Sequence, residues 1–164
     1  MRTRGSIFAA VCALALVVAV PLALAATVQE EARAQYKAAV EPICRENSQA
    51  NQHILAGVAA KVRKGKLKAA GRQFVRASAA LQRTLRQLEA VPRPEADAPR
   101  LTEWLKRVGS EATLLRKIGK ALEAGQKRKA ESLVARLESG ARLTNAMVIS
   151  FSFHYCRFEP SKYT

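Results

Sequence analysis

Apolar residues recur at steps of three and four along most of this chain, and this spacing constrains the fold more than any other feature of the sequence. A period near 3.6 residues returns each apolar side chain to one face of an α-helix, whereas a strand needs simple alternation. Four such segments occur, at 29–64, 66–90, 98–124 and 127–150. The sequence therefore predicts an all-α protein made of four amphipathic helices.

Helix-breaking residues separate these segments. Gly65 lies between the first two, and Gly125 follows the third, where helices commonly end with a left-handed residue. A proline-rich stretch, 91–99, separates the second from the third, and Asp97 within it is predicted to cap the third helix. Because short connections make consecutive helices antiparallel neighbours, we expect an up-down-up-down four-helix bundle over 42–150.

The first helical segment is too long for its partners, and Pro42 divides it. At 1.5 Å per residue, a helix over 29–64 would extend for about 53 Å, whereas one over 66–90 extends for about 36 Å. Proline removes a backbone donor and disfavours helix in the residue before it. We therefore expect 26–41 to form a helical extension beyond the bundle, either kinked or separate.

Residues 1–25 have the pattern of a secretory signal peptide. Arg2 and Arg4 precede a long apolar run that closes on the small-residue sequence ALA at 23–25. This pattern predicts cleavage near Ala25 and an exported protein, extracellular or associated with the cell envelope. The apolar run is also long enough to serve as an uncleaved transmembrane anchor, which is the alternative.

Removal of 1–25 leaves two cysteines, Cys44 and Cys156. An exported compartment permits disulfides, and two cysteines allow one intramolecular pair. In the expected topology, the start of the segment after Pro42 and the C-terminal end of 127–150 lie at the same end of the bundle. We therefore predict a disulfide between the two cysteines, with two separate buried thiols as the alternative.

Aromatic residues gather in the C-terminal tail, 151–164, after a body that contains few of them. The sequence FSFHYC alternates rather than following the helical period, so we expect the chain to leave the helix near Ser152 and turn back. Phe153 and Tyr155 are predicted to plug the open end of the bundle, held there by the disulfide. Stacking of a carbohydrate or another ligand on these rings is the alternative.

The chain contains no catalytic motif. It has two histidines, His53 and His154, and no sequence typical of a metalloprotease, a serine hydrolase, a phosphate-binding loop or a covalent haem site. His154 and the two cysteines would give three neighbouring ligands, one fewer than a structural zinc site needs. We therefore expect a non-catalytic protein without metal or cofactor, and a ligand- or metal-sensing bundle is the alternative.

Positive charge is concentrated where two of the predicted turns lie at the same end of the bundle. The basic residues of 61–68 and 116–129 form this end, here called the basic pole. They are Lys61, Arg63, Lys64, Lys66, Lys68, Arg116, Lys117, Lys120, Lys127, Arg128 and Lys129. Together with Glu123 and Glu131 they give this end a net charge of +9, within a total of +15 for the chain.

A surface of this charge attracts anions. For an exported protein, the basic pole predicts an anionic membrane surface or wall polymer as the partner, and a merely solvated surface is the alternative. Nucleic acid is disfavoured by export and by the lack of aromatic residues in 61–68 and 116–129 on which bases would stack. A protein partner is not identified, but the segment 29–41 offers a further surface for one through an apolar stripe at Val28, Ala32, Tyr36 and Val40, with a frayed terminus as the alternative.

A set of loosely spaced motifs resembles a broad group of small exported helical proteins from actinobacteria. The matching residues are Tyr36, Ile43, Cys44, Arg45, Pro92, Pro94, Trp104, Ala121, Leu122, Gly125, Asn145, Phe153 and Cys156. The resemblance covers residues 35–160 and implies a helical bundle with a cysteine pair and no assigned activity. Such proteins often carry Asp after the Ala-Gly turn, where this chain has Gln126, and this departure affects the predicted start of the fourth helix.

Overall fold

A computed structural model describes residues 19–163 of the chain, and the predicted signal peptide, 1–25, lies mainly outside them. The elements are α1 (Ala19–Leu55), α2 (Val58–Arg63), α3 (Leu67–Glu89), the 3₁₀ turn η1 (Glu95–Asp97), α4 (Ala98–Glu123), α5 (Lys127–Ser150) and the 3₁₀ turn η2 (Pro160–Lys162). Among these described elements, no helix has the length and apolar character needed to cross a membrane.

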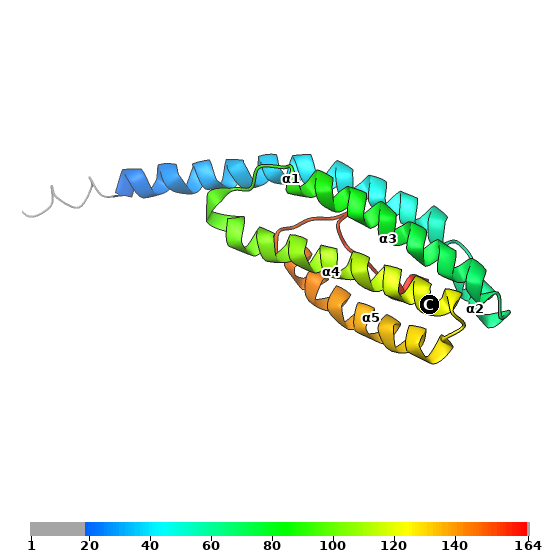
Figure 1. The fold of residues 1–164 in the computed structure, drawn as a ribbon. Helices are drawn as coiled ribbons and strands as arrows, with labels where there is room; N and C mark the ends of the chain where they lie inside the picture. The colour runs from blue at the N-terminus through cyan, green and yellow to red at the C-terminus, as the bar shows by residue number, and fades with distance from the viewer. Residues whose placement is uncertain (1–18, 164) are drawn as a thin grey trace, which may run out of the picture.

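The four long helices form the predicted up-down-up-down bundle. Helix α3 packs against α4, α4 packs against α5, and α1 lies along α3 (Figure 1). The apolar stripes predicted from the sequence face inward, and Trp104, Leu115 and Ile118 on α4 are at most 1% exposed. Because α4 contacts both α3 and α5, its stripe supplies much of the core.

The extension predicted for 26–41 is only partly separate from the bundle. Helix α1 continues through Pro42, and the buried residues Tyr36, Val40 and Cys44 follow one another at steps of four across it. Pro42 is exposed on another face, so its ring meets solvent and its missing N–H costs one backbone hydrogen bond. Burial of the stripe offsets that cost, and the N-terminal part of α1 projects beyond the other helices (Figure 1).

The first helix instead breaks at Gly57, which the predicted helix 29–64 did not anticipate. Gly57 has φ +67°, in the left-handed region that favours glycine, and the short α2 follows it. The end of α1 is held by Gln73 of α3, whose side-chain amide donates to the carbonyls of Ile54 and Ala56 at 2.7 and 3.0 Å. These bonds satisfy acceptors that the end of a helix leaves open.

Asp97 stands at the predicted capping position of α4, but its side chain does not cap the helix. The carboxylate instead accepts two hydrogen bonds from the Arg33 guanidinium of α1, from Nε at 2.5 Å and from Nη2 at 2.8 Å. These hydrogen bonds and the adjacent charge hold the pKa of Asp97 below its usual range. The prediction that Asp97 caps α4 is therefore wrong, because a bidentate arginine competes better for a buried carboxylate.

The tail leaves α5 at Ser150 and turns at Ser152, which has φ +56°. Phe153 is 3% exposed and packs against the rings of Tyr36 and Trp104, so it fills the end of the bundle as predicted. Tyr155 is 42% exposed and lies outside the core, which corrects its predicted role. The chain bends and turns between Phe153 and Tyr155, so it is not extended there and the two rings need not point the same way.

Candidate anion-binding site at the basic pole

Two turns of the same geometry form the basic pole. Gly65 joins α2 to α3 with φ +70°, and Gly125 joins α4 to α5 with φ +72°. In each turn the residue after the glycine donates its N–H to the carbonyl five residues earlier, at 2.8 Å. This is the Schellman ending of a helix, in which glycine supplies the left-handed residue. The predicted end of the helix at Gly125 is confirmed.

A close approach of α3 and α4 brings the two turns together. The helices meet at Gly71 and Gly119, and a Cβ placed on Gly71 would lie 2.5 Å from the carbonyl oxygen of Gly119. Both glycines are buried, so the backbones themselves form the contact. Beyond this crossing, residues of both turns line one shallow hollow, including Lys66, Lys68 and Arg72. The cations of this hollow come from the Gly65 turn and α3, and α4 contributes Leu122 and Glu123 to its lining.

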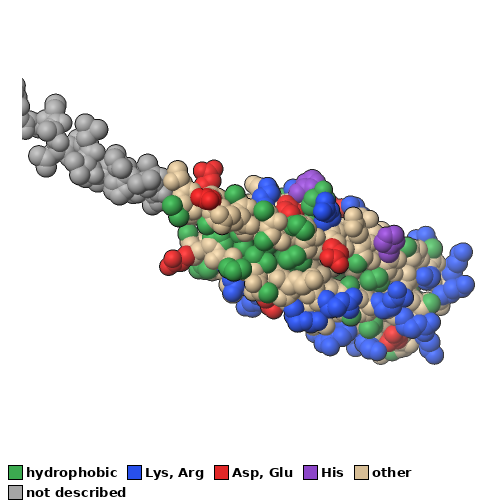
Figure 2. All heavy atoms as spheres, turned by 90° about the horizontal axis from the view of Figure 1, so that it is seen from above, with side chains coloured by type: hydrophobic (Ala, Val, Ile, Leu, Met, Phe, Trp, Pro, Cys, Tyr) green, Lys and Arg blue, Asp and Glu red, His purple; other side chains and the backbone are tan. Residues whose placement is uncertain are grey.

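A second hollow lies on the α4–α5 side of the basic pole. Four cationic side chains line it, and its lining includes no carboxylate; the residues are Arg116, Lys117, Lys120, Ala121, Gln126, Lys129 and Leu133. We call this feature the cationic hollow. Figure 2 shows Lys and Arg side chains gathered at the end of the molecule far from the grey N-terminal residues. Four residues of the basic pole thus line the cationic hollow.

Ten of the eleven predicted pole residues are exposed, and Lys61 is half-buried. Lys61 Nζ donates to Gln73 Oε1 at 2.8 Å, so this lysine supports the side chain that closes the end of α1. Lys120 pairs with Glu123 at 2.8 Å, and Lys127 lies 3.9 Å from Glu131. Exposed ion pairs of this kind contribute little to stability, so they leave most of the positive charge of the pole available.

Arg72 joins the basic pole, although the eleven predicted residues do not include it. It follows Lys68 at a step of four, which places the two side chains on one face of α3. This spacing was visible in the sequence. The prediction omitted Arg72 because it considered the turn and the first residues of the helix only.

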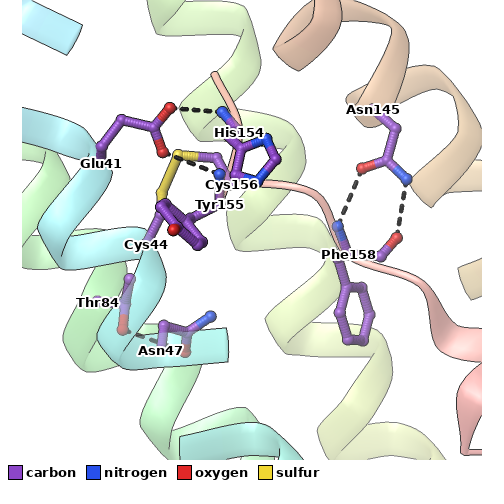
Figure 3. Close-up of a disulfide and its surroundings, with 9 residues drawn as sticks. All are labelled: Glu41, Cys44, Asn47, Thr84, Asn145, His154, Tyr155, Cys156 and Phe158. Atoms are coloured by element: carbon purple, nitrogen blue, oxygen red, sulfur yellow. Dashed lines mark hydrogen bonds between the residues drawn. A yellow bond between two sulfur atoms is a disulfide. The ribbon is translucent and has the colours of Figure 1, made fainter. Parts of the chain in front are cut away.

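The predicted disulfide joins Cys44 to Cys156 at the other end of the molecule, with Cα atoms 4.8 Å apart. Beside it, the Glu41 carboxylate accepts hydrogen bonds from the backbone N–H groups of His154 and Tyr155 (Figure 3). These contacts fix the tail to α1. The ring of Tyr155 lies against the Arg45 guanidinium, 5.5 Å from the ring centroid, rather than in an open stacking surface.

A second contact fixes the tail to α5. The Asn145 side chain accepts from the backbone N–H of Phe158 at 3.0 Å and donates to the carbonyl of the same residue at 2.9 Å (Figure 3). The tail therefore bridges the bundle from α1 to α5. The aromatic tail therefore serves to pack the core, as predicted.

The disulfide also removes the two cysteines from the metal site considered for them and His154. The two sulfur atoms are bonded to each other, and a cysteine binds zinc as a thiolate rather than as a disulfide. Within residues 19–163, no group of three or more His, Cys, Asp and Glu side chains is placed to hold a metal ion.

Glu111 is a buried carboxyl group that the sequence analysis passed over. It is 3% exposed on α4, and one of its carboxyl oxygens has no hydrogen-bond partner. Burial raises its pKa to about 7, while contact with the Thr144 hydroxyl and the charge of Arg107 act in the opposite direction. Glu111 falls among the apolar positions of its helix, between Val108 and Ala112, and that placement was the available signal.

The substitution Glu111→Gln is expected to stabilise the protein at alkaline pH. Because the folded pKa is about 7 and the ordinary value is 4.5, the folded state binds more protons, and stability falls as pH rises between these values. The variant lacks this loss, so above pH 7 it should gain up to about 3 kcal/mol over the wild type, with little difference below pH 4.5. Urea denaturation across this pH range measures both curves.

The exposed residue Glu89 provides the control for this comparison. The substitution Glu89→Gln changes the net charge equally and should leave the pH dependence of the wild type intact. Parallel curves for the wild type and Glu111→Gln would show that Glu111 does not govern the pH dependence of stability.

Comparison of the chain with protein-family models, with curated proteins and with solved structures gives no match. A role for the protein must therefore be inferred from its own residues.

Proposed function

We propose that this protein is an exported, non-catalytic helical bundle that binds an anionic surface of the cell envelope through its basic pole. The observation that carries the proposal is the cationic hollow, whose lining includes Arg116, Lys117, Lys120 and Lys129 and no carboxylate; Lys120 also pairs with Glu123, which lies outside the lining. Near an anionic membrane each Lys or Arg contributes about 1 kcal/mol, so four neighbouring cations favour binding strongly.

The scaffold beneath the pole supports this proposal. The crossing of α3 and α4 at Gly71 and Gly119 is a contact between backbones, and the Gly65 and Gly125 turns are closed by backbone hydrogen bonds. These contacts fix the ends of α2, α3, α4 and α5 at the basic pole. The array is thus formed before an anion arrives, which lowers the cost of ordering it on binding.

Export is supported by the signal-peptide pattern of 1–25 and by a disulfide, a bond typical of oxidising compartments. The basic pole lies at the end of the bundle far from the projecting start of α1 (Figures 1 and 2). Cleavage near Ala25 would leave the protein free to turn this end toward a membrane. An uncleaved anchor would instead direct it away from the anchoring membrane, toward wall polymers.

Replacing Arg116, Lys117, Lys120 and Lys129 with glutamine is expected to weaken binding to anionic vesicles by about 100-fold at ionic strengths near 0.1 M. The loss follows from removal of four cations that face one surface. Sedimentation of the protein with phosphatidylglycerol vesicles measures the binding, and neutral phosphatidylcholine vesicles and a purified anionic wall polymer run in parallel identify the preferred partner.

The matched control replaces four exposed cations outside the pole, Arg83, Arg86, Arg142 and Arg157, with glutamine. It has the same net charge as the pole variant. The proposal expects the control to retain most of the binding, because position rather than total charge matters. Equal losses in the two variants, or no binding of the wild type to any anionic partner, would show that the pole is only a solvated surface.

A further inference from the structure

A second concave surface adjoins the basic pole, and it is apolar. A groove of 330 Å³ lies between α2 and α5, and its floor is formed by Phe74 of α3 and Ile118 of α4. Val62 of α2 and Val134 of α5 form its sides, and Tyr163 of the tail forms part of a wall. Its volume is within the range of small-molecule sites, about 300–1,000 Å³. We call it the α2–α5 groove.

The groove exists because α2 and α5 do not close on each other. Helix α2 packs on α3, α5 packs on α4, and the tail places η2 against α5, so that Tyr163 reaches the groove. Val62 and Val134 are therefore only half-buried, although each lies on the inward face of its helix. Covering these half-buried side chains with a further apolar group would be favourable, because it removes their remaining apolar surface from water.

Charges are distributed unevenly along the groove. Arg63, the last residue of α2, and Lys127, the first residue of α5, line the groove and also belong to the basic pole. Glu131 follows one turn further along α5, where it pairs with Lys127 at 3.9 Å, and Glu138 lies near the opposite end. The end of the groove at the pole therefore carries two cations and one carboxylate, a net charge of +1, and Glu138 lies toward the far end.

This arrangement fits a ligand with an anionic head and an apolar tail. From Lys127 to Glu138, α5 rises by about 16 Å, which is comparable to the extended length of a lauryl or myristyl chain. An acyl chain entering from the pole would lie along Val62, Ile118 and Val134, with its head beside Arg63 and Lys127. The reverse orientation would place the head at the far end of the groove, where the lining includes neither Arg63 nor Lys127.

We propose that the α2–α5 groove binds one acyl chain of an anionic membrane lipid, with the headgroup held at the basic pole. This inference rests on the proposed function and names its target class, because a wall polymer has no acyl chain to place in the groove. A free fatty acid shares the same chemistry of a carboxylate head on an apolar chain. It therefore serves as the probe.

The binding experiment uses dansyl-aminoundecanoic acid, whose fluorescence rises in an apolar site, as the probe. The wild type should bind it, and laurate and lysophosphatidylglycerol should displace it. Dodecyltrimethylammonium, with a similar chain and a cationic head, should displace it at least tenfold less well. The double substitution of Arg63 and Lys127 with glutamine should weaken laurate by about tenfold or more and leave dodecanol unchanged, which separates recognition of the head from recognition of the chain.

A matched pair of variants tests the site itself. The substitution Ala135→Trp fills the groove from an exposed position of α5, and Ala146→Trp places the same side chain on the same helix outside the groove. The first should lower the affinity for the probe at least tenfold, and the second should leave it unchanged; circular dichroism confirms that both fold. Equal probe binding by the two variants, or none by the wild type, would overturn the assignment of the groove.

The failure of this inference is distinguishable from failure of the proposed function. Vesicle binding without binding of the probe would leave the basic pole as an electrostatic site and exclude the groove. The groove could instead be closed by a second copy of the chain, which would appear as a dimer in sedimentation velocity. A dimer that is dissociated by Ala135→Trp and unaffected by laurate would also overturn the proposal. Extraction of phosphatidylglycerol from vesicles by the wild type, lost in Ala135→Trp, would identify the membrane lipid as the source of the chain.

Discussion

Removing the Cys44–Cys156 disulfide is expected to lower the free energy of unfolding by about 4–5 kcal/mol, the largest effect of any change considered for this protein. The bond joins residues 112 apart in sequence, so the chain that it closes into a loop includes most of the bundle. In the chain-entropy description, breaking so long a loop gives the unfolded chain much more freedom. Urea denaturation of a Cys44→Ala, Cys156→Ala variant measures the loss.

Trp104 is a suitable reporter for this measurement. It is the one tryptophan of the chain, it is 1% exposed, and its ring contacts Phe153 of the tail. Reduction of the wild type should lower its stability to that of the alanine variant, while the variant itself should not respond to reductant. A loss below about 1 kcal/mol would show that the contacts of Glu41 and Asn145 hold the tail without help from the disulfide.

The second large effect is expected at the crossing of α3 and α4. The substitution Gly119→Ala should destabilise the protein by about 2–3 kcal/mol, because the added methyl group has no room. A Cβ at this position would lie 2.6 Å from the carbonyl oxygen of Gly71 and 3.0 Å from the backbone nitrogen of Val75. Backbone atoms cannot rotate away as a side chain can, so the two helices must separate. Chemical denaturation gives the size of the effect.

Gly140 on α5 supplies the control for this prediction. A Cβ there would meet nothing within 4 Å, so Gly140→Ala should stabilise the protein by about 0.5–1 kcal/mol through helix propensity alone. The two substitutions add the same methyl group to the interior of a helix, and their difference isolates the cost of the crossing. Equal effects of the two substitutions would mean that α3 and α4 can accommodate a methyl group where they meet. A destabilised crossing should also separate the Gly65 and Gly125 turns and weaken binding at the basic pole.

The sequence was a good guide to features that depend on period and topology. The stripes of α3, α4 and α5 and the turn at Gly125 follow from spacing, and the meeting of Cys44 and Cys156 follows from the order of the helices. The neighbouring positions of the two basic turns follow from the same topology. These features need no knowledge of how closely the helices approach.

The features that the sequence did not predict depend on competition between tertiary contacts. Pro42 was expected to divide the first helix, leaving a kinked or separate extension, but it lies on the exposed face of a helix whose buried stripe continues through it at Tyr36, Val40 and Cys44. Asp97 was expected to cap α4, but Arg33 lies within reach from 64 residues away. The cationic hollow and the α2–α5 groove likewise depend on the distance between helices and on the path of the tail. Neither quantity can be read from local spacing.

The position of the tail at the C-terminal end of the described chain affects the order in which the core can be closed during synthesis and folding. A chain made from its N-terminus presents Tyr36 and Trp104 long before Phe153, the ring that packs on both, has been added. Cys44 must likewise persist as a free thiol until Cys156 follows it. Helices that pack before residues 151–163 leave Tyr36 and Trp104 without the ring that covers them, and this end of the core closes only in the step in which the tail packs. Any cellular factor that shields the growing chain would have to remain until that step is complete.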